Sequence, residues 1–131
     1  MRGGSARLLQ ADLKEPAEIR RMFSEVSETT ERLDVLVSNA ASGVLRDALD
    51  LSAKHWDWVL NTNVRPLLLC AQEAAKRMGP GGRIVSLSSL GSTRVIPRYA
   101  AIGASKAALE ALTRYLAVEL APRGIAVNAV A

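Results

Sequence analysis

Tyr99 and Lys106 are the residues of this chain whose types and spacing suggest chemistry. They stand seven positions apart in the stretch "RYAAIGASK", where an apolar helical pattern begins. On an ideal helix, seven residues make almost two turns, so both side chains share a face roughly 10.5 Å apart along the axis. A phenol near an ammonium group is a better proton donor to a substrate oxygen. From the spacing alone, an ordinary surface lysine and a loop tyrosine are the simpler interpretation.

Tyr115 is the other tyrosine of the chain. It follows Lys106 by nine residues, which places it about 180° around the same helix. Tyr115 therefore cannot share a site with Lys106, and helical geometry selects Tyr99 as the partner.

The elements that must position this pair follow from the hydrophobic pattern. Short apolar runs alternate with longer stretches of helical spacing, which predicts right-handed crossovers and an α/β fold with a doubly wound parallel sheet. The near-continuous apolar run at 33–40 is typical of a parallel strand covered on both faces. The predicted strands are 6–13, 33–40, 83–89 and 125–131, and the predicted helices are 15–28, 53–78 and 104–121.

Two prolines modify this pattern. Pro66 removes a backbone hydrogen bond inside the longest predicted helix, so we expect a kink there. Pro97 disfavours a helix immediately before it. We therefore expect residues 90–102 to be irregular.

Small and polar residues follow successive predicted strands, namely Asp12, then "SNAAS", then "SLSSLGS". Ligands of open α/β sheets lie beyond the carboxyl ends of the strands, where such residues let a cofactor approach the backbone. Taken singly, Asn39 and Ser42 are better explained as residues that shape a turn. Their recurrence at successive strand ends favours a binding site.

Composition restricts the classes of function. The 131 residues are 49% hydrophobic and 23% charged, which is typical of one globular domain. The net charge is +4, but the basic residues are scattered among acids, so we expect no nucleic-acid surface. No apolar run approaches the length of a membrane span or of a secretory signal. The single cysteine, Cys70, lies in an apolar helical run, which predicts a buried core residue and a soluble cytoplasmic protein.

Residues 1–131 are expected to form a partial domain. No strand–GxGxxG–helix unit, which would bind the pyrophosphate of a dinucleotide, occurs in the sequence. The chain also stops in or just after an apolar strand. We therefore expect a piece of a larger fold that lacks the first strand–helix units and the C-terminal strand.

The order of motifs from Asp12 to Val130 resembles the short-chain dehydrogenase/reductase superfamily. "SNAAS" stands where its members carry an Asn-Asn-Ala-Gly turn, "NTNV" where they carry a helix asparagine, and "IVSLSS" where they carry the active-site strand. "SKAALEALTRYLAVELAPRGIAVNAV" is similar to the helix and strand that close their site. The resemblance implies a Rossmann-like sheet and a nicotinamide cofactor.

Ile102 stands four residues before Lys106, where most ketone reductases of this superfamily carry their tyrosine. The Tyr-x6-Lys spacing of Tyr99 and Lys106 resembles the enoyl-acyl-carrier-protein reductases instead. "NAASGVLRDALDLSAKHWDW" is most similar to their NADPH-using type III branch. The resemblance therefore implies reduction of enoyl thioesters in fatty-acid biosynthesis, with NADPH as the cofactor and NADH as a possible substitute.

The resemblance also implies catalytic roles. Tyr99 would hydrogen-bond the thioester carbonyl and stabilise the enolate, and Lys106 would hold the ribose of the nicotinamide. Ser89 stands where ketone reductases keep a substrate-binding serine, although some enoyl reductases carry a second tyrosine there. Asn63 matches the asparagine that supports a proton path near the lysine.

The cofactor contacts are implied in the same way. Asp12 and Leu13 would contact the adenine, and Asn39, Ala40 and Ala41 would pack against the ribose on the adenosine side. The turn reads Asn-Ala-Ala where the family motif ends in glycine, so a methyl group projects where the backbone approaches the cofactor. No metal ligands are predicted.

Three functions stay open from the sequence. The first is the enoyl-thioester reductase, and the second is a 3-oxoacyl or carbonyl reductase, which Ile102 disfavours. The third is a noncatalytic remnant that acts through assembly, since helices 53–78 and 105–121 resemble those through which the superfamily forms homodimers and homotetramers. Without the glycine loop, the 131 residues alone are expected to bind NADPH poorly and to show no robust turnover.

Overall fold

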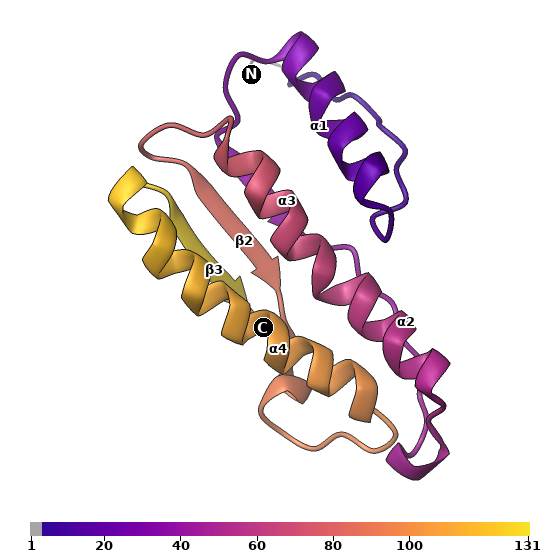
Figure 1. Ribbon diagram of the computed structural model, residues 1–131. Coiled ribbons are helices and arrows are strands. Elements are labelled where there is room, and N and C mark those ends of the chain that lie inside the picture. The colour runs from indigo at the N-terminus through magenta and orange to yellow at the C-terminus, as the bar shows by residue number, and fades with distance from the viewer. Residues whose placement is uncertain (1–3) are drawn as a thin grey trace.

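A computed structural model describes residues 4–131 and contains one parallel sheet of three strands, ordered β1-β2-β3. Figure 1 shows β2 and β3 side by side. Val35 pairs with Arg83, and Arg83 in turn pairs with Ala126, so the three strands start in register. The strands are β1 (Val35–Ser38), β2 (Arg83–Leu87) and β3 (Ala126–Val130). The helices are α1 (Pro16–Thr29), α2 (Ala53–Asn63), α3 (Arg65–Ala75) and α4 (Ala100–Leu120), with 3-10 turns η1 (Ala48–Asp50), η2 (Leu90–Ser92) and η3 (Ala121–Arg123).

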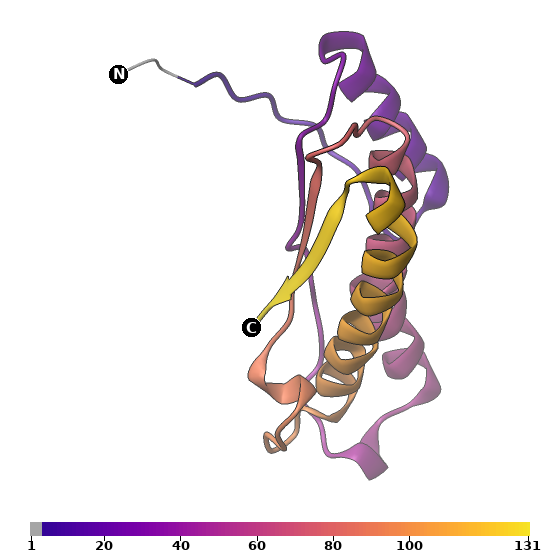
Figure 2. The same ribbon diagram turned by 90° about the vertical axis from the view of Figure 1, so that its left-hand side faces the viewer.

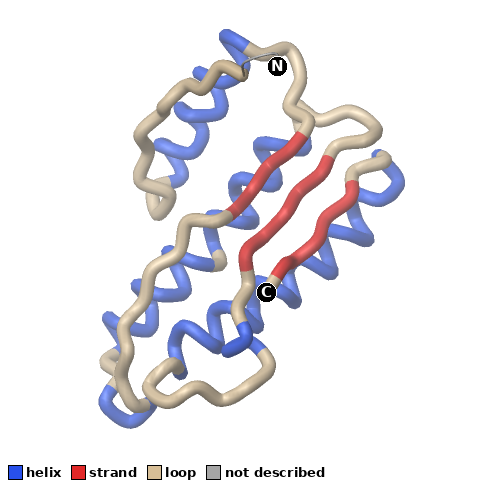
Figure 3. Tube along the Cα trace, turned by 180° about the vertical axis from the view of Figure 1, so that it is seen from behind, coloured by secondary structure: helices blue, strands red, loops and turns tan. Residues whose placement is uncertain are grey.

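All four helices lie on one side of this sheet (Figures 2 and 3). Both crossovers step across the sheet in the same direction, and right-handed crossovers of that kind put their helices on the same face. The α/β, Rossmann-like parallel sheet is thus confirmed. The opposite face carries Val35 and Val37, which are 51% and 56% exposed, so the described residues cover β1 on one face and not on both.

The predicted strand at 6–13 is wrong. The segment has no regular structure up to Ala11 and ends in a turn, where the backbone N–H of Glu15 donates to the carbonyl of Asp12 at 3.0 Å. A strand requires a neighbouring backbone to receive its hydrogen bonds, and the described residues place none beside this segment. Leu8 is 94% exposed, and Figure 2 shows the segment leading away from the sheet.

The predicted helix at 53–78 is two helices, α2 and α3, which meet at Val64. The kink expected from Pro66 is confirmed, because the proline lies in the first turn of α3, where its missing N–H is tolerated. The N–H of Leu67 donates to the carbonyl of Val64 at 3.1 Å, which tightens the junction. α3 ends at Ala75, three residues before the predicted end.

α4 begins at Ala100, four residues before the predicted start, and Tyr99 is its N-cap residue. The N–H of Gly103 donates to the carbonyl of Tyr99 at 2.7 Å and closes the first turn. Pro97 restricts only the residue before it, so the chain is free to become helical three residues later. Tyr99 is therefore fixed at the start of a helix rather than in an irregular loop.

The hydrophobic core lies between the sheet and the helices and is built mainly from alanine and branched aliphatic side chains. Cys70 is buried within it, which confirms the predicted core position, and burial raises the pKa of its thiol to about 11. Within residues 4–131, no helix is both long and apolar enough to cross a membrane. The principal core residues are Ile19, Phe23, Leu67, Ala71, Ala74, Ile84, Leu109, Leu116, Ile125 and Val127.

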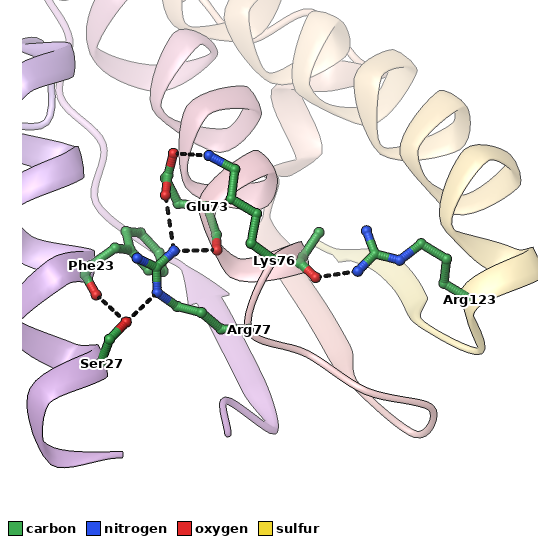
Figure 4. Close-up of polar contacts among 7 residues, drawn as sticks. Phe23, Ser27, Glu73, Lys76, Arg77 and Arg123 are labelled. Carbon is green, nitrogen blue, oxygen red and sulfur yellow. Dashed lines mark hydrogen bonds and ion pairs between the residues drawn. The ribbon is translucent and has the colours of Figure 1, made fainter. Parts of the chain in front are cut away.

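Arg77 connects α1 to α3 at the edge of this core (Figure 4). Its guanidinium lies 5.4 Å from the centre of the Phe23 ring and donates to the hydroxyl of Ser27 at 2.7 Å. It also donates to the carboxylate of Glu73 at 2.9 Å, which Lys76 contacts at 2.6 Å. Arg123, the last residue of η3, donates to the carbonyl of Ala75 at the end of α3 (Figure 4). These contacts hold the helical layer together.

The hydrogen bonds from Lys76 and Arg77 hold the pKa of Glu73 below its ordinary value. A carboxylate with a lowered pKa stabilises the fold above its ordinary pKa, and this contribution is lost as the pH falls through the lowered value. We expect Glu73→Gln to reduce the free energy of unfolding by about 1 kcal/mol at neutral pH. The difference should disappear in acid, once the pH is below the lowered pKa of Glu73.

Urea unfolding of the wild-type and variant proteins at both pH values measures this effect. Glu28→Gln is the matched control, since Glu28 is exposed on α1 and takes part in none of the ion pairs among residues 4–131. An equal deficit of Glu73→Gln at both pH values would contradict the prediction.

Candidate active site

Lys106 joins α4 to the carboxyl end of β2. Its Nζ donates to the carbonyl of Leu87, the last residue of the strand, at 2.6 Å. The lysine is 6% exposed, and this burial lowers its pKa from the ordinary value. An ammonium group has three N–H donors, so two are left for a ligand beyond the strand end.

Glu110 makes a second connection one turn further along α4. Its carboxylate accepts a hydrogen bond from the hydroxyl of Ser88, the residue after β2. The hydroxyls of Ser88 and Ser92 hold the pKa of Glu110 below its usual range. The start of segment 88–92 is therefore attached to α4 through Ser88 and Glu110.

Tyr99 faces this segment from the start of α4. Its hydroxyl lies 3.5 Å from the hydroxyl of Ser89, which is too long for a strong hydrogen bond. Both groups are thus available to an oxygen of a substrate. The structure therefore brings Tyr99 and Ser89 together, and it anchors Lys106 two residues away at Leu87.

Two glycines allow this arrangement. A methyl group on Gly91 would come within 2.5 Å of the Tyr99 ring, so the ring lies directly on the backbone of η2. A methyl group on Gly103 would come within 2.7 Å of the carbonyl of Gly91, so α4 also packs closely on this turn. The position of the phenol depends on the absence of both side chains.

Arg98 fixes Tyr99 from the other side. It has φ of +62°, in the left-handed region that is costly for a residue with a side chain. Its carbonyl accepts from the N–H of Arg46 at 2.8 Å, and its guanidinium donates to the carbonyl of Leu45 at 3.1 Å. Arg46 and Tyr99 form an isolated parallel bridge. The 44–47 loop therefore helps to set the tyrosine.

Ile102 contacts Gly43. A methyl group on Gly43 would come within 2.3 Å of the Ile102 side chain, so the isoleucine packs on the loop that follows β1. Tyr115 is 70% exposed, far along the helix. The phenol beside Ser89 thus comes from Tyr99.

Asn63 connects the loop after β1 to α4. Its side-chain carbonyl accepts from the N–H of Ser42 at 2.8 Å. Its amide donates to the carbonyl of Ser42 and to the hydroxyl of Ser105, each at 2.9 Å. The side chain is buried and occupied by protein partners, so the proton-path role predicted for it stays a prediction.

The predicted cofactor contacts come together at the end of β1. Asp12, Leu13, Ala40 and Ala41 line one cavity of about 240 Å³. Asn39 does not line this cavity; it is exposed just before it. Small side chains and a carboxylate acceptor suit a flat heterocycle with exocyclic donors, which fits the predicted adenine position.

Sequence reasoning missed further residues of this region. Lys14 and Thr62 also line the cavity, and Lys14 approaches the Asp12 carboxylate at 3.4 Å. The hydrogen bond from the backbone N–H of Lys14 lowers the pKa of Asp12. Thr62 directly precedes Asn63 in the motif "NTNV", so that motif indicates its position. No sequence pattern indicates Lys14 or Gly91.

The whole chain, residues 1–131, matches the family model described as enoyl-(acyl carrier protein) reductase. The chain belongs to this reductase family. This confirms the resemblance that its motifs predict. Its relatives are oxidoreductases, and several of them are named as short-chain dehydrogenases or reductases.

Three relatives of this family member are informative. The 1-cyclohexenylcarbonyl-CoA reductase of Streptomyces collinus is 48% identical over 98% of the chain and 46% of the relative. The Bacillus cereus enoyl-acyl carrier protein reductase with NADP+ and an indole naphthyridinone is 30% identical, with a TM-score of 0.91 over 98% of the chain and 51% of its own. A Burkholderia cenocepacia short-chain dehydrogenase in complex with NADP is 42% identical, with a TM-score of 0.87 over 92% and 50%. The chain thus spans about half the length of the relatives it matches.

Gly91→Ala tests the position of Tyr99. The added methyl group would overlap the ring, so we expect the ring to move and the free energy of unfolding to fall by about 1–3 kcal/mol. The chain has two tyrosines, so NMR of ¹³C-labelled tyrosine resolves Tyr99, with the exposed Tyr115 as an internal reference.

Gly79→Ala is the control, because a methyl group there would meet only the tip of the Arg32 side chain at 3.9 Å. The Tyr99 signals should shift in Gly91→Ala and stay in place in Gly79→Ala. Unchanged Tyr99 signals in Gly91→Ala would mean that the ring does not lie on this backbone.

Proposed function

We propose that this chain carries the catalytic groups of an NADPH-dependent reductase of enoyl thioesters. The reaction reduces the 2,3 double bond of an enoyl group on an acyl carrier protein or coenzyme A, as in fatty-acid biosynthesis. One observation carries this proposal: the phenol that meets Ser89 belongs to Tyr99, while Ile102 packs on Gly43. The similarity to a reductase of a cyclohexenylcarbonyl-CoA supports a conjugated thioester as the substrate.

Tyr99 and Ser89 act on the carbonyl oxygen of the thioester. A nicotinamide, when bound, would supply a hydride to the β-carbon, and a proton would add to the α-carbon to complete the reduction. Negative charge then develops on the carbonyl oxygen, and the hydroxyls of Tyr99 and Ser89 donate hydrogen bonds to it. Donors that are already in place at the developing charge lower the barrier, since they need not reorganise.

Lys106 supports this step electrostatically. Its ammonium group lies at the end of β2, where the carbonyl of Leu87 holds it. A positive charge near a phenol favours the phenolate, so Tyr99 gives its proton more readily. The remaining N–H donors of Lys106 can hold the hydroxyls of a ribose.

The residues near β1 would hold the adenosine part of the cofactor. The cavity lined by Asp12, Leu13, Ala40 and Ala41 fits an adenine ring, and Asn39 lies just before the two alanines. Several similar structures are complexes with NAD or NADP, which supports a nicotinamide cofactor. Within this class we propose NADPH.

A carbonyl reductase is the second candidate. The pairing of Tyr99 with a serine, rather than with a second tyrosine, favours it, because a serine–tyrosine pair can polarise an isolated ketone. The two candidate functions differ in substrate. An enoyl reductase would reduce crotonyl thioesters, whereas a carbonyl reductase would reduce acetoacetyl thioesters.

We further propose assembly into homodimers or homotetramers through α2–α3 and α4. Val118 supports this, since it is 75% exposed on α4. The unpaired thiol of Cys70 supports a reducing compartment such as the cytoplasm.

Tyr99→Phe tests the proposed chemistry. Removal of the hydroxyl should lower kcat for crotonyl-CoA by about 10²–10³-fold, because the donor to the enolate oxygen is lost. NADPH oxidation by the full-length protein is measured with crotonyl and acetoacetyl thioesters. Tyr115→Phe, which changes the exposed tyrosine, should keep the wild-type rate. Reduction of acetoacetyl but not crotonyl thioesters would favour the second candidate.

The variant Tyr99→Phe/Ile102→Tyr tests which position can supply the phenol. Residue 102 points at Gly43, so a tyrosine there should not restore activity and should strain the loop after β1. We expect the double variant to stay as inactive as Tyr99→Phe toward both thioesters. Recovery of either activity would show that position 102 reaches the site.

A further inference from the structure

The cavity that contains Tyr99 is rimmed by three arginines. It measures about 530 Å³ and lies between residues 46–48 and residues 91–104. Arg46, Arg94 and Arg98 all line it, and all three are exposed. Tyr99 and the three arginines therefore line the same cavity.

The charge of this rim is not balanced. None of the ion pairs among residues 4–131 involves Arg46, Arg94 or Arg98. Asp47 is the one carboxylate in the lining, against three arginines. Asp50 lies at an adjoining cavity with Arg46 and Arg98, so the acidic residues are outnumbered at the mouth.

The three arginines lie on segments that also position Tyr99 or adjoin η2. Arg98 directly precedes Tyr99, and its carbonyl receives the N–H of Arg46 at 2.8 Å. Arg94 follows η2, and its own N–H donates to the carbonyl of Leu90 at 3.0 Å. A ligand that occupies this cavity would therefore lie beside both Tyr99 and the three positive charges.

We propose that Arg46, Arg94 and Arg98 bind the phosphate groups of the substrate's carrier, and so distinguish carrier-bound thioesters from free ones. This rests on the proposed function, since it assumes a thioester substrate at Tyr99. Coenzyme A and the phosphopantetheine arm of an acyl carrier protein both carry phosphate beyond the acyl group. Guanidinium groups match phosphate oxygens in charge and geometry. Exposed charges at a cavity mouth also attract an anionic substrate in a salt-dependent manner.

The test compares crotonyl-CoA and crotonyl-acyl carrier protein with crotonyl-pantetheine, which has the same thioester but no phosphate. The variant is Arg46→Gln/Arg94→Gln in the full-length protein with NADPH. Arg98 is left intact because its guanidinium also donates to the carbonyl of Leu45, whereas Arg46 supports Tyr99 through its backbone, which the substitution keeps. We expect kcat/KM for the two phosphate-bearing substrates to fall at least about tenfold, mainly through KM. The value for crotonyl-pantetheine should change less than about twofold. Arg20→Gln, on the exposed side of α1, is the control and should change none of the three values.

The outcomes separate the possibilities. A loss with both phosphate-bearing substrates supports the phosphate shared by the two carriers, and a loss with crotonyl-CoA alone supports the phosphates of its nucleotide. An equal loss with all three substrates overturns the proposal, because the arginines would then act only by placing Tyr99. A loss with the carrier protein alone also overturns it, since the contact would be to that protein's surface.

Failure of the proposed function is distinguishable from failure of this site. If the wild-type protein reduces none of the three thioesters, the enoyl-reductase proposal fails. The arginine site is then decided by calorimetric titration with coenzyme A and with pantetheine. Binding of coenzyme A that weakens at least about tenfold in the double variant supports the site, and binding that is absent or unchanged overturns it.

Discussion

The contact between the buried ammonium of Lys106 and the carbonyl of Leu87 is the interaction on which the site depends. It attaches the middle of one helix to the end of one strand, and so fixes where α4 lies along β2. Glu110 repeats the connection one turn later through Ser88. Burial of the lysine opposes its charge, and the strand-end carbonyl offsets part of this cost by accepting its hydrogen bond. A helix anchored in this way holds its N-terminus, and therefore Tyr99, in one place.

Tyr99 is held by the backbone more than by side chains. Its ring lies on Gly91, Gly103 lets η2 approach α4, and Arg98 adopts a left-handed conformation just before it. The bridge to Arg46 adds the loop after β1 to this support. Such an arrangement stores strain that the surrounding hydrogen bonds offset, and strained backbone of this kind is typical of functional sites. The same constraints set the arginine rim, because Arg46 and Arg98 are part of the support.

Much of the local structure was predictable from the sequence, because it depends on periodicity and on prolines. The runs at 33–40, 83–89 and 125–131 contain the three strands, and Pro66 does break the long helix. The strand predicted at 6–13 is not formed. An apolar pattern alone does not make a strand, because a neighbouring backbone must also receive its hydrogen bonds. α4 starts at Ala100, four residues before the predicted start, because Pro97 restricts only the residue before it.

The sequence by itself determined the seven-residue spacing of Tyr99 and Lys106, the isoleucine at position 102 and the family to which they point. These features are local, and helical geometry relates them without further information. Only the tertiary structure decided that Tyr99 meets Ser89, that Ile102 packs on Gly43, and that Asn63 joins Ser42 to Ser105. These contacts join segments from 10 to about 60 residues apart, and the packing of helices on the sheet fixes them. Periodicity in a single segment carries no information on that packing.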